Sequence, residues 1–221
     1  MRTVIFDLDG TLADTSGDLL AAANAALGQE VLTAPRDNGI ALRGGRAMLR
    51  EGLTRLGEAD SPAREAKVDA MYQPLLRFYE EKLDVHTVLY PGVETALDAL
   101  DHMGCAVGIC TNKPEYLAQE LMVRLGVRDR FASLIGADTL PVRKPAPEPV
   151  WEAIDRAGGD RTNAVLVGDS DTDRNAARAA GVQSLLVTFG PSGEDMKALD
   201  PEALLASYEN LPRQIELMLS A

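Results

Sequence analysis

The chain has 221 residues, of which 46% are hydrophobic and 25% charged, the composition of a folded protein that buries an aliphatic core. Its 34 acidic and 22 basic residues give a formal net charge of −12, which disfavours nonspecific binding to nucleic acid or to anionic membranes. A length between one and two average domains predicts one large domain or a domain that carries an insertion.

The cysteine spacing and the short apolar runs indicate in which cellular compartment the protein is located. Cys105 and Cys110 lie in one extended-looking run, about 16 Å apart, which is too far for a disulfide bond. The first residues meet Asp7 after three apolar side chains, and no run of 18 apolar residues occurs, so neither a signal peptide nor a membrane span is expected. We therefore predict a cytoplasmic protein without a membrane partner.

Short apolar runs alternate with longer amphipathic stretches over most of the chain. The predicted strands are Thr3–Phe6, Ala106–Cys110, Ser133–Gly136, Ala164–Val167 and Ser184–Phe189. The predicted helices between them are a segment that begins at Val93 and is closed by Gly104, then Glu115–Leu125, Glu148–Ala157 and Thr172–Ala180. This alternation predicts an α/β fold with a doubly wound, Rossmann-like parallel sheet.

The alternation stops after the first strand, where only helical patterns occur for nearly seventy residues. These helices are predicted at Leu19–Leu27, at Ala47–Leu56 and at Pro62–Lys82, the last with a kink at Pro74. We therefore expect an α/β core formed by residues 1–14 and 86–221, and an inserted α-helical domain formed by residues 15–85.

Chemically active side chains follow the predicted strands. The first strand runs into Asp7 and Asp9, the second into Thr111, the third is followed by Lys144, and the fourth runs into Asp169 and Asp173. Ligands of open parallel sheets bind at the carboxyl ends of the strands, so these groups are expected to share one crevice. Carboxylates beside a lysine suit Mg²⁺ and a phosphate group.

These segments resemble the four motifs of the haloacid dehalogenase-like hydrolases, in order. Asp7–Asp14 resembles the first motif, and Thr111, Lys144 and Gly168–Asp173 resemble the other three. Within this superfamily, Thr111-Asn112-Lys113-Pro114 is most similar to phosphoglycolate phosphatases. The resemblance implies a helical cap and the activity of a Mg²⁺-dependent phosphatase that hydrolyses small phosphate esters. The leading candidate substrate is 2-phosphoglycolate, and we expect a monomer or homodimer.

The resemblance also implies catalytic roles. Asp7 would attack phosphorus in line and form an aspartyl-phosphate that water then hydrolyses. Asp9 would protonate the leaving group and later accept a proton from the attacking water. Thr111 would hydrogen-bond a phosphoryl oxygen, and Lys144 would balance the negative charge of Asp7 and of the phosphoryl group.

A Mg²⁺ site is implied by the same resemblance. Its ligands would be Asp7, the backbone carbonyl of Asp9, Asp169 and Asp173. Asp173 would bind through water or orient the other ligands. Because it lies near a predicted helix start, a role for Asp173 as a helix cap alone stays open.

The resemblance also implies residues that contact the substrate, in two parts of the chain. In the matched motifs these residues are Gly10, Thr11, Asn112 and Lys113, and in the inserted segment they are Arg43, Gly45 and Arg46. Related phosphatases usually carry a glycine-containing loop at the second place without two arginines, and arginine can clamp a carboxylate or phosphate. Alternatively, Arg43 and Arg46 pair with surface acids, and Lys113 is a solvated surface lysine.

Other functions remain alternatives. A phosphosugar mutase has the same fold, but such relatives typically carry serine-rich sequence where this chain has Thr111–Pro114. A generalist sugar-phosphate or nucleotide phosphatase would use the same core motifs. A dehalogenase is disfavoured because Asp9 is present, and a non-catalytic phosphate-binding module is disfavoured because the acid/base, lysine and metal motifs are all intact.

Overall fold

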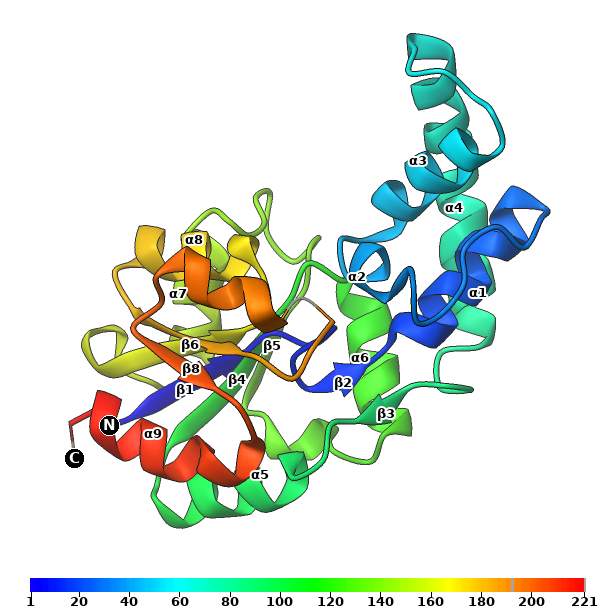
Figure 1. Cartoon of the computed structure of the whole chain (residues 1–221). Helices are drawn as coiled ribbons and strands as arrows, with labels where there is room; N and C mark the ends of the chain where they lie inside the picture. The colour runs from blue at the N-terminus through cyan, green and yellow to red at the C-terminus, as the bar shows by residue number, and fades with distance from the viewer. Residues whose placement is uncertain (192, 221) are drawn as a thin grey trace. The chain divides into compact units, whose positions relative to one another are not determined.

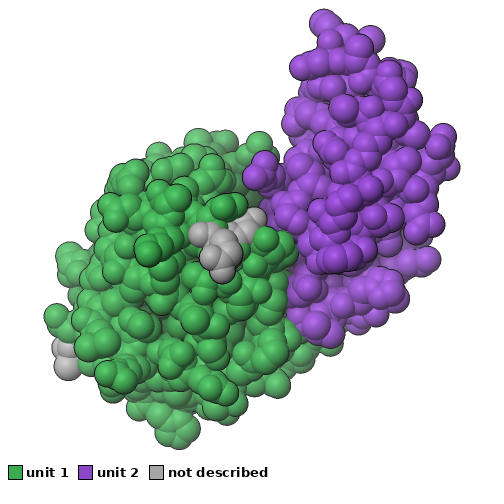
Figure 2. Space-filling model, in the orientation of Figure 1, with its two compact units in different colours: residues 1–13, 89–221 green, residues 14–88 purple. Residues whose placement is uncertain are grey.

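The computed structural model describes residues 1–191 and 193–220, which form two compact units (Figure 2). Residues 1–13 and 89–221 make up the first, which we call the core unit, and residues 14–88 make up the second, the inserted unit. The structural division thus falls at 13/14 and 88/89, where the sequence predicts 14/15 and 85/86.

A six-stranded sheet organises the core unit, and every strand pairs parallel to its neighbours (Figure 1). The strands are β1 (Thr3–Phe6), β4 (Ala106–Cys110), β5 (Ser133–Ile135), β6 (Ala164–Gly168), β7 (Gln183–Val187) and β8 (Ala203–Leu205). Their order is β5-β4-β1-β6-β7-β8, so β1 is central and the winding reverses beside it. The predicted doubly wound parallel sheet is confirmed.

Helices cover both faces of this sheet. They are α5 (Val93–His102), α6 (Glu115–Arg124), α7 (Glu148–Arg156), α8 (Asp171–Ala180) and α9 (Leu211–Met218). Helices α7 and α8 lie on one face, and α5 and α9 pack together on the other (Figure 1). Short 3-10 helices occur at Arg128–Arg130 (η1), Arg161–Asn163 (η2), Gly193–Leu199 (η3) and Tyr208–Asn210 (η4). Strand β8 and helix α9 were not predicted from the sequence.

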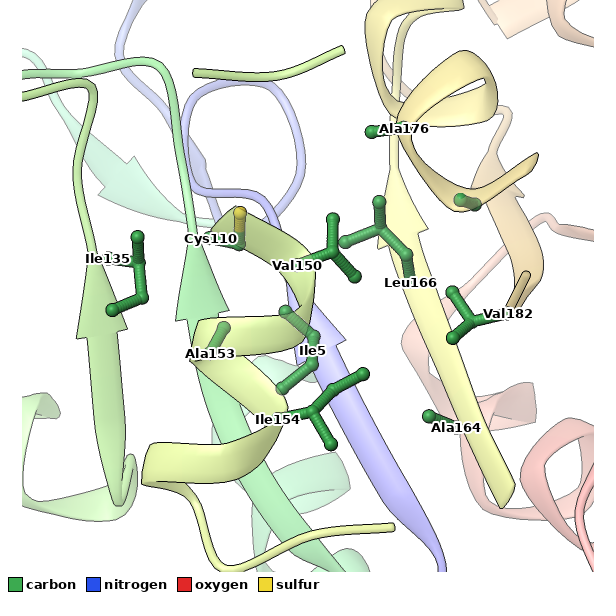
Figure 3. Close-up of a cluster of buried hydrophobic side chains, with 11 residues drawn as sticks. Ile5, Cys110, Ile135, Val150, Ala153, Ile154, Ala164, Leu166, Ala176 and Val182 are labelled. Atoms are coloured by element: carbon green, nitrogen blue, oxygen red, sulfur yellow. The ribbon is translucent and has the colours of Figure 1, made fainter. Parts of the chain in front are cut away.

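An apolar cluster fixes α7 against the centre of the sheet. Val150, Ala153 and Ile154 of α7 lie over Ile5 of β1 and Cys110 of β4 (Figure 3). All five side chains are fully buried, so the strands that end at the site are held by close packing from one face. Both cysteines are free thiols, and burial raises the pKa of Cys110 to about 12, which makes it a packing residue.

The inserted unit is helical. It contains α1 (Ser16–Leu27), α2 (Asn38–Ala41), α3 (Gly45–Arg55) and α4 (Pro62–Glu81), and the chain passes through the short paired strands β2 (Ala13–Asp14) and β3 (Val88–Leu89) at its two ends. Helix α4 continues through Pro74. Buried Asp37 accepts hydrogen bonds from both Arg36 and Arg55, which ties the segment before α2 to the end of α3. Throughout the described residues, no helix has the length and apolar character required to cross a bilayer.

Candidate active site

The site lies at the carboxyl ends of β1, β4 and β6, where the register of the sheet brings three segments to one level. Phe6 lies opposite both Ile109 and Val167, so the residues that follow these strands are neighbours. The backbone N–H of Asp7 donates to the carbonyl of Val167 at 2.8 Å, which extends the ladder by one residue into the site. The predicted convergence of strand ends is therefore present.

A buried lysine connects two of the predicted acids. Lys144 Nζ donates to Asp173 Oδ1 at 2.6 Å and lies 3.1 Å from Asp7 Oδ1. Asp7 Oδ1 is itself buried and has no hydrogen-bond partner among the described residues. The lysine thus faces both carboxylates from the interior, where water cannot screen the charges.

Three carboxylates crowd around this lysine. One oxygen each of Asp7, Asp169 and Asp173 lies within 4.8 Å of the others. Burial raises the pKa of Asp7 to about 6, opposed by Lys144 and reinforced by the charges of Asp173 and Asp9. Burial and the charges of Asp173 and Asp7 hold the pKa of Asp169 well above its usual value. The pKa of Lys144 is raised because Asp173 and Asp7 outweigh its burial.

The start of α8 holds Asp173 in place. Ser170 is the N-cap, its hydroxyl accepts from the N–H of Asp173 at 3.3 Å, and it donates to Asp173 Oδ2 at 2.5 Å. A Cβ on Gly168 would lie 2.4 Å from the Cβ of Asp173, so only glycine leaves room for this carboxylate. Asp173 therefore takes part in capping and also lies in the acidic cluster.

Asp9 has a partner that the sequence did not indicate. Lys113 Nζ donates to Asp9 Oδ1 at 2.9 Å, and the lysine side chain is only 3% exposed. The Lys113 N–H also donates to the hydroxyl of Thr111 at 3.2 Å, and exposed Asn112 donates through Nδ2 to the carbonyl of Lys144 at 3.0 Å. The segment after β4 thus connects Asp9 with the Lys144 loop, and Lys113 is not a solvated surface lysine.

The turn after β1 carries Gly10 and Thr11. Gly10 has φ +81°, a backbone conformation that favours glycine, and its N–H donates to the carbonyl of Ala13 at 2.9 Å. The Thr11 hydroxyl donates to Asp169 Oδ1 at 3.1 Å, and the threonine is fully buried. In the structure, Thr11 therefore contacts a carboxylate of the cluster.

Arg43, Gly45 and Arg46 belong to the inserted unit. Arg43 is exposed, whereas Arg46 pairs with Asp69 and its guanidinium lies 4.7 Å from the ring centroid of Tyr72. A Cβ on Gly45 would lie 3.1 Å from Leu75, so close packing of α3 on α4 accounts for this glycine. The predicted surface pairing is thus observed for Arg46.

A further acid near the strand ends binds a helix start instead. Asp138, which follows β5, accepts from the N–H of Glu115 at 2.8 Å and so binds the start of α6. It does not partner Lys144, whose amine lies beside Asp7 and Asp173.

The chain is similar to known proteins over most of its length. Residues 4–187 match the family model described as haloacid dehalogenase-like hydrolase. The chain is 45% identical over 192 residues to a phosphoglycolate phosphatase of Xanthomonas campestris pv. campestris (strain 8004), covering 86% of this chain and 84% of that one. It is 36% identical over 220 residues to a phosphoglycolate phosphatase of Agrobacterium fabrum (strain C58 / ATCC 33970), covering 98% and 93%. A solved haloacid dehalogenase-like family hydrolase from Streptococcus pneumoniae shares the fold, with a TM-score of 0.80 at 21% identity over 98% and 99% of the two chains.

Proposed function

The chain belongs to the haloacid dehalogenase-like hydrolase family, and from this premise we propose that it is a Mg²⁺-dependent phosphatase whose substrate is 2-phosphoglycolate. One observation carries the proposal: Asp7, Asp169 and Asp173 surround the buried amine of Lys144 at the strand ends. When all three carboxylates are ionised, they carry two more negative charges than Lys144 compensates. That excess suits a divalent cation and disfavours a purely structural role.

The donor set fits Mg²⁺. The three carboxylates offer hard oxygen ligands within 4.8 Å of one another, and Asp7 Oδ1 is a buried acceptor with no hydrogen-bond partner among the described residues. Asp7 and Asp169 would hold the ion, with Asp173 and the backbone carbonyl of Asp9 completing or orienting the set. When bound, Mg²⁺ would neutralise phosphate charge and align the phosphoryl group.

Asp7 is the proposed nucleophile. Its carboxylate would attack phosphorus as the bond to the ester oxygen breaks, and water would then hydrolyse the aspartyl-phosphate to release inorganic phosphate. Lys144, 3.1 Å away, opposes the burial that favours the protonated acid and so helps keep the attacking group ionised. The hydroxyl of Thr111, at the end of β4, is the proposed donor to a phosphoryl oxygen.

Asp9 is the proposed general acid and base. It follows Asp7 by two residues, and its carboxylate is paired with Lys113 at 2.9 Å. An anionic substrate would compete with Asp9 for Lys113, so binding would release the carboxyl group for proton transfer to the leaving oxygen. Gly10, Thr11 and Asn112 would shape the backbone around the phosphoryl group.

The substrate is proposed from the relatives and from the cations near the sequence motifs. Proteins 45% and 36% identical to this chain carry the name phosphoglycolate phosphatase. Phosphoglycolate adds a carboxylate to the phosphate, and Lys113, Arg43 and Arg46 are the candidate cations for it. We expect a small-molecule substrate, no nucleic acid or membrane partner, a cytoplasmic location and a monomer or homodimer.

Phosphate release by the purified protein tests this proposal. A panel of 2-phosphoglycolate, sugar phosphates, nucleotides and pyrophosphate is assayed after chelation and again with added Mg²⁺. The proposal expects Mg²⁺-dependent release with the highest kcat/KM for phosphoglycolate. A flat profile would indicate a generalist, interconversion of sugar phosphates without phosphate release would indicate a mutase, and no turnover with any ester would indicate a binding module.

A further inference from the structure

Tyr208 reaches the candidate site from the far end of the chain. It begins η4, outside residues 4–187 that match the family model, and is 1% exposed. Its hydroxyl donates to the backbone carbonyl of Thr11 at 2.8 Å. This hydrogen bond joins segments 197 residues apart in the chain.

The accepting carbonyl belongs to the turn that follows the proposed nucleophile. The next carbonyl, that of Leu12, accepts from the N–H of Tyr90 at 3.0 Å. Two successive carbonyls of this turn are therefore held by donors from outside it. Loss of either donor would leave a buried carbonyl unsatisfied, which the turn could relieve only by moving.

The tyrosine ring is fixed independently of its hydroxyl. Its centroid lies 5.4 Å from that of Phe189, which in turn lies 4.8 Å from that of Tyr90. A Cβ on Gly92 would lie 3.2 Å from the Cβ of Tyr208, so glycine allows the close approach. Since packing holds the ring, removal of the oxygen alone tests the hydrogen bond.

Thr11 also connects Tyr208 to the acidic cluster. While the Thr11 carbonyl accepts from Tyr208, the Thr11 hydroxyl donates to Asp169 Oδ1 at 3.1 Å. Burial, followed by the charge of Asp169, raises the pKa of Tyr208, so the phenol stays protonated and can only donate to the carbonyl.

We propose that Tyr208 is a positioning residue that acts through Thr11: its hydroxyl fixes the turn after β1 and thereby orients the Asp169 carboxylate. The inference rests on the proposed function, because it assigns Asp169 to the Mg²⁺ site. Side chains that orient a ligand typically change metal affinity by about 10–100-fold when removed. Because Tyr208 acts on Asp169 only through Thr11, its removal should weaken Mg²⁺ binding by a smaller factor.

The test compares Tyr208→Phe, Thr11→Val and the double variant. Mg²⁺ binding is measured by calorimetry without substrate, and kcat and KM are measured with p-nitrophenyl phosphate. We expect Thr11→Val to weaken Mg²⁺ binding roughly 10-fold or more and Tyr208→Phe at least about threefold, with kcat falling more than KM changes. The double variant should be within about twofold of Thr11→Val, because both changes break one pathway.

Phe189→Leu is the matched control, because it loosens the ring packing and keeps the hydroxyl. It should lower Tm but leave Mg²⁺ affinity within about twofold of the starting protein. Wild-type Mg²⁺ binding by Tyr208→Phe, an equal loss in Phe189→Leu, or multiplied losses in the double variant would overturn the proposal. If Tyr208→Phe does not fold, unchanged Mg²⁺ binding by Thr11→Val overturns it. Wild-type protein that binds Mg²⁺ yet hydrolyses no ester contradicts the proposed function instead.

Discussion

Lys144 Nζ donates to Asp173 Oδ1 at 2.6 Å, and both side chains are 1% exposed. A pair this deeply buried gains its attraction at a large desolvation cost, so its presence is weak evidence for stability by itself. The same amine lies 3.1 Å from Asp7, whose carboxylate shares a cluster with Asp169. The lysine therefore contacts two of the three carboxylates of this cluster, and several measurable properties depend on it.

Replacing this lysine should destabilise the protein strongly. Lys144→Met leaves two or three acids buried without their cation, and breaking a buried pair in this way costs about 3–5 kcal/mol. Denaturant unfolding followed by the fluorescence of Trp151, the sole tryptophan, measures the loss. Part of it should be recovered with Mg²⁺, which supplies positive charge at the same place.

Lys197→Met is the control for that measurement, because Lys197 is an exposed lysine of the same unit. It should change the free energy of unfolding by less than about 0.5 kcal/mol. Equal stability of the Lys144 and Lys197 variants would show that the buried amine compensates no charge.

The stabilisation by Mg²⁺ should depend on pH. Burial and the neighbouring acids raise the pKa of Asp7 to about 6 and hold that of Asp169 above its usual value. A raised carboxyl pKa stabilises the fold fully below the unfolded value near 4, and this stability is lost as the pH rises through the folded value near 6. Mg²⁺ therefore has more repulsion to relieve at about pH 7.5 than at about pH 5, and its effect on Tm should be larger at the higher pH.

Other acids also make Tm depend on pH. Comparing Tm with and without Mg²⁺ at the same pH removes their contribution. Asp37, for example, has its pKa lowered chiefly by its hydrogen bonds from Arg55, so its stabilisation is instead lost on acidification. An Mg²⁺ effect on Tm that is equal at both pH values would contradict the expected charge state of the cluster.

Asp7→Asn should abolish phosphate release and leave the fold intact. An amide is a far poorer nucleophile than a carboxylate, and it also weakens metal binding. Because the change removes one of three crowded negative charges, the metal-free variant should be at least as stable as the starting protein at neutral pH. Residual activity of a tenth or more, in protein whose circular dichroism is unchanged, would show that Asp7 is not the nucleophile.

The sequence predicted the parts of the fold and site that local patterns encode. Five of the six parallel strands are continuous apolar runs, and the acids that follow them are visible as motifs. The edge strand β8 has only three residues and only Leu205 is buried, so its apolar signal is weak. Helix α9, in contrast, carries apolar residues at helical spacing, Leu211, Ile215 and Met218, so the sequence could have indicated it.

Side-chain partners were harder to predict because they depend on tertiary approach. The Lys113–Asp9 pair joins residues 104 positions apart, and the Tyr208–Thr11 hydrogen bond joins residues 197 positions apart. Neither lysine nor tyrosine sits in a pattern that specifies its partner. The helical spacing of Ser170 and Asp173, in contrast, is the local signature of a capped helix, and it could have indicated their mutual hydrogen bonds.

Asp9→Asn should lower activity in a way that depends on the leaving group. Loss of general acid/base catalysis typically costs about 10²–10⁴-fold in rate. The loss should be smaller for p-nitrophenyl phosphate, whose leaving group needs little protonation, than for an alkyl phosphate. Asn112→Ala serves as a control because it keeps the Lys113–Asp9 pair and should affect both esters alike. Equal losses on alkyl and aryl esters in Asp9→Asn would remove Asp9 from the acid/base role.

We propose that arginines of the inserted unit help to select the organic part of the substrate, because the matched core motifs are expected to bind chiefly the phosphoryl group. A charge-assisted pair with the carboxylate of phosphoglycolate would contribute about 1.5–3 kcal/mol, or about 10–150-fold in discrimination. Arg43→Ala and Arg46→Ala should therefore lower kcat/KM for phosphoglycolate more than for p-nitrophenyl phosphate. The effect should be larger for exposed Arg43, since Arg46 must first leave Asp69 and Tyr72.

Arg50→Ala provides a matched control from α3, the helix that also carries Arg46. Arg50 of α3 makes hydrogen bonds of 2.8–3.0 Å to the carboxylate of Glu65, at an exposed position where pairing contributes little. Its removal should leave the ratio of kcat/KM for the two substrates unchanged. If Arg43→Ala and Arg46→Ala reduced both activities equally, this loop would not recognise the carboxylate, and Lys113 would be the cation to test next. A Lys113→Met variant that also kept the preference for phosphoglycolate would show that none of these three cations recognises the carboxylate.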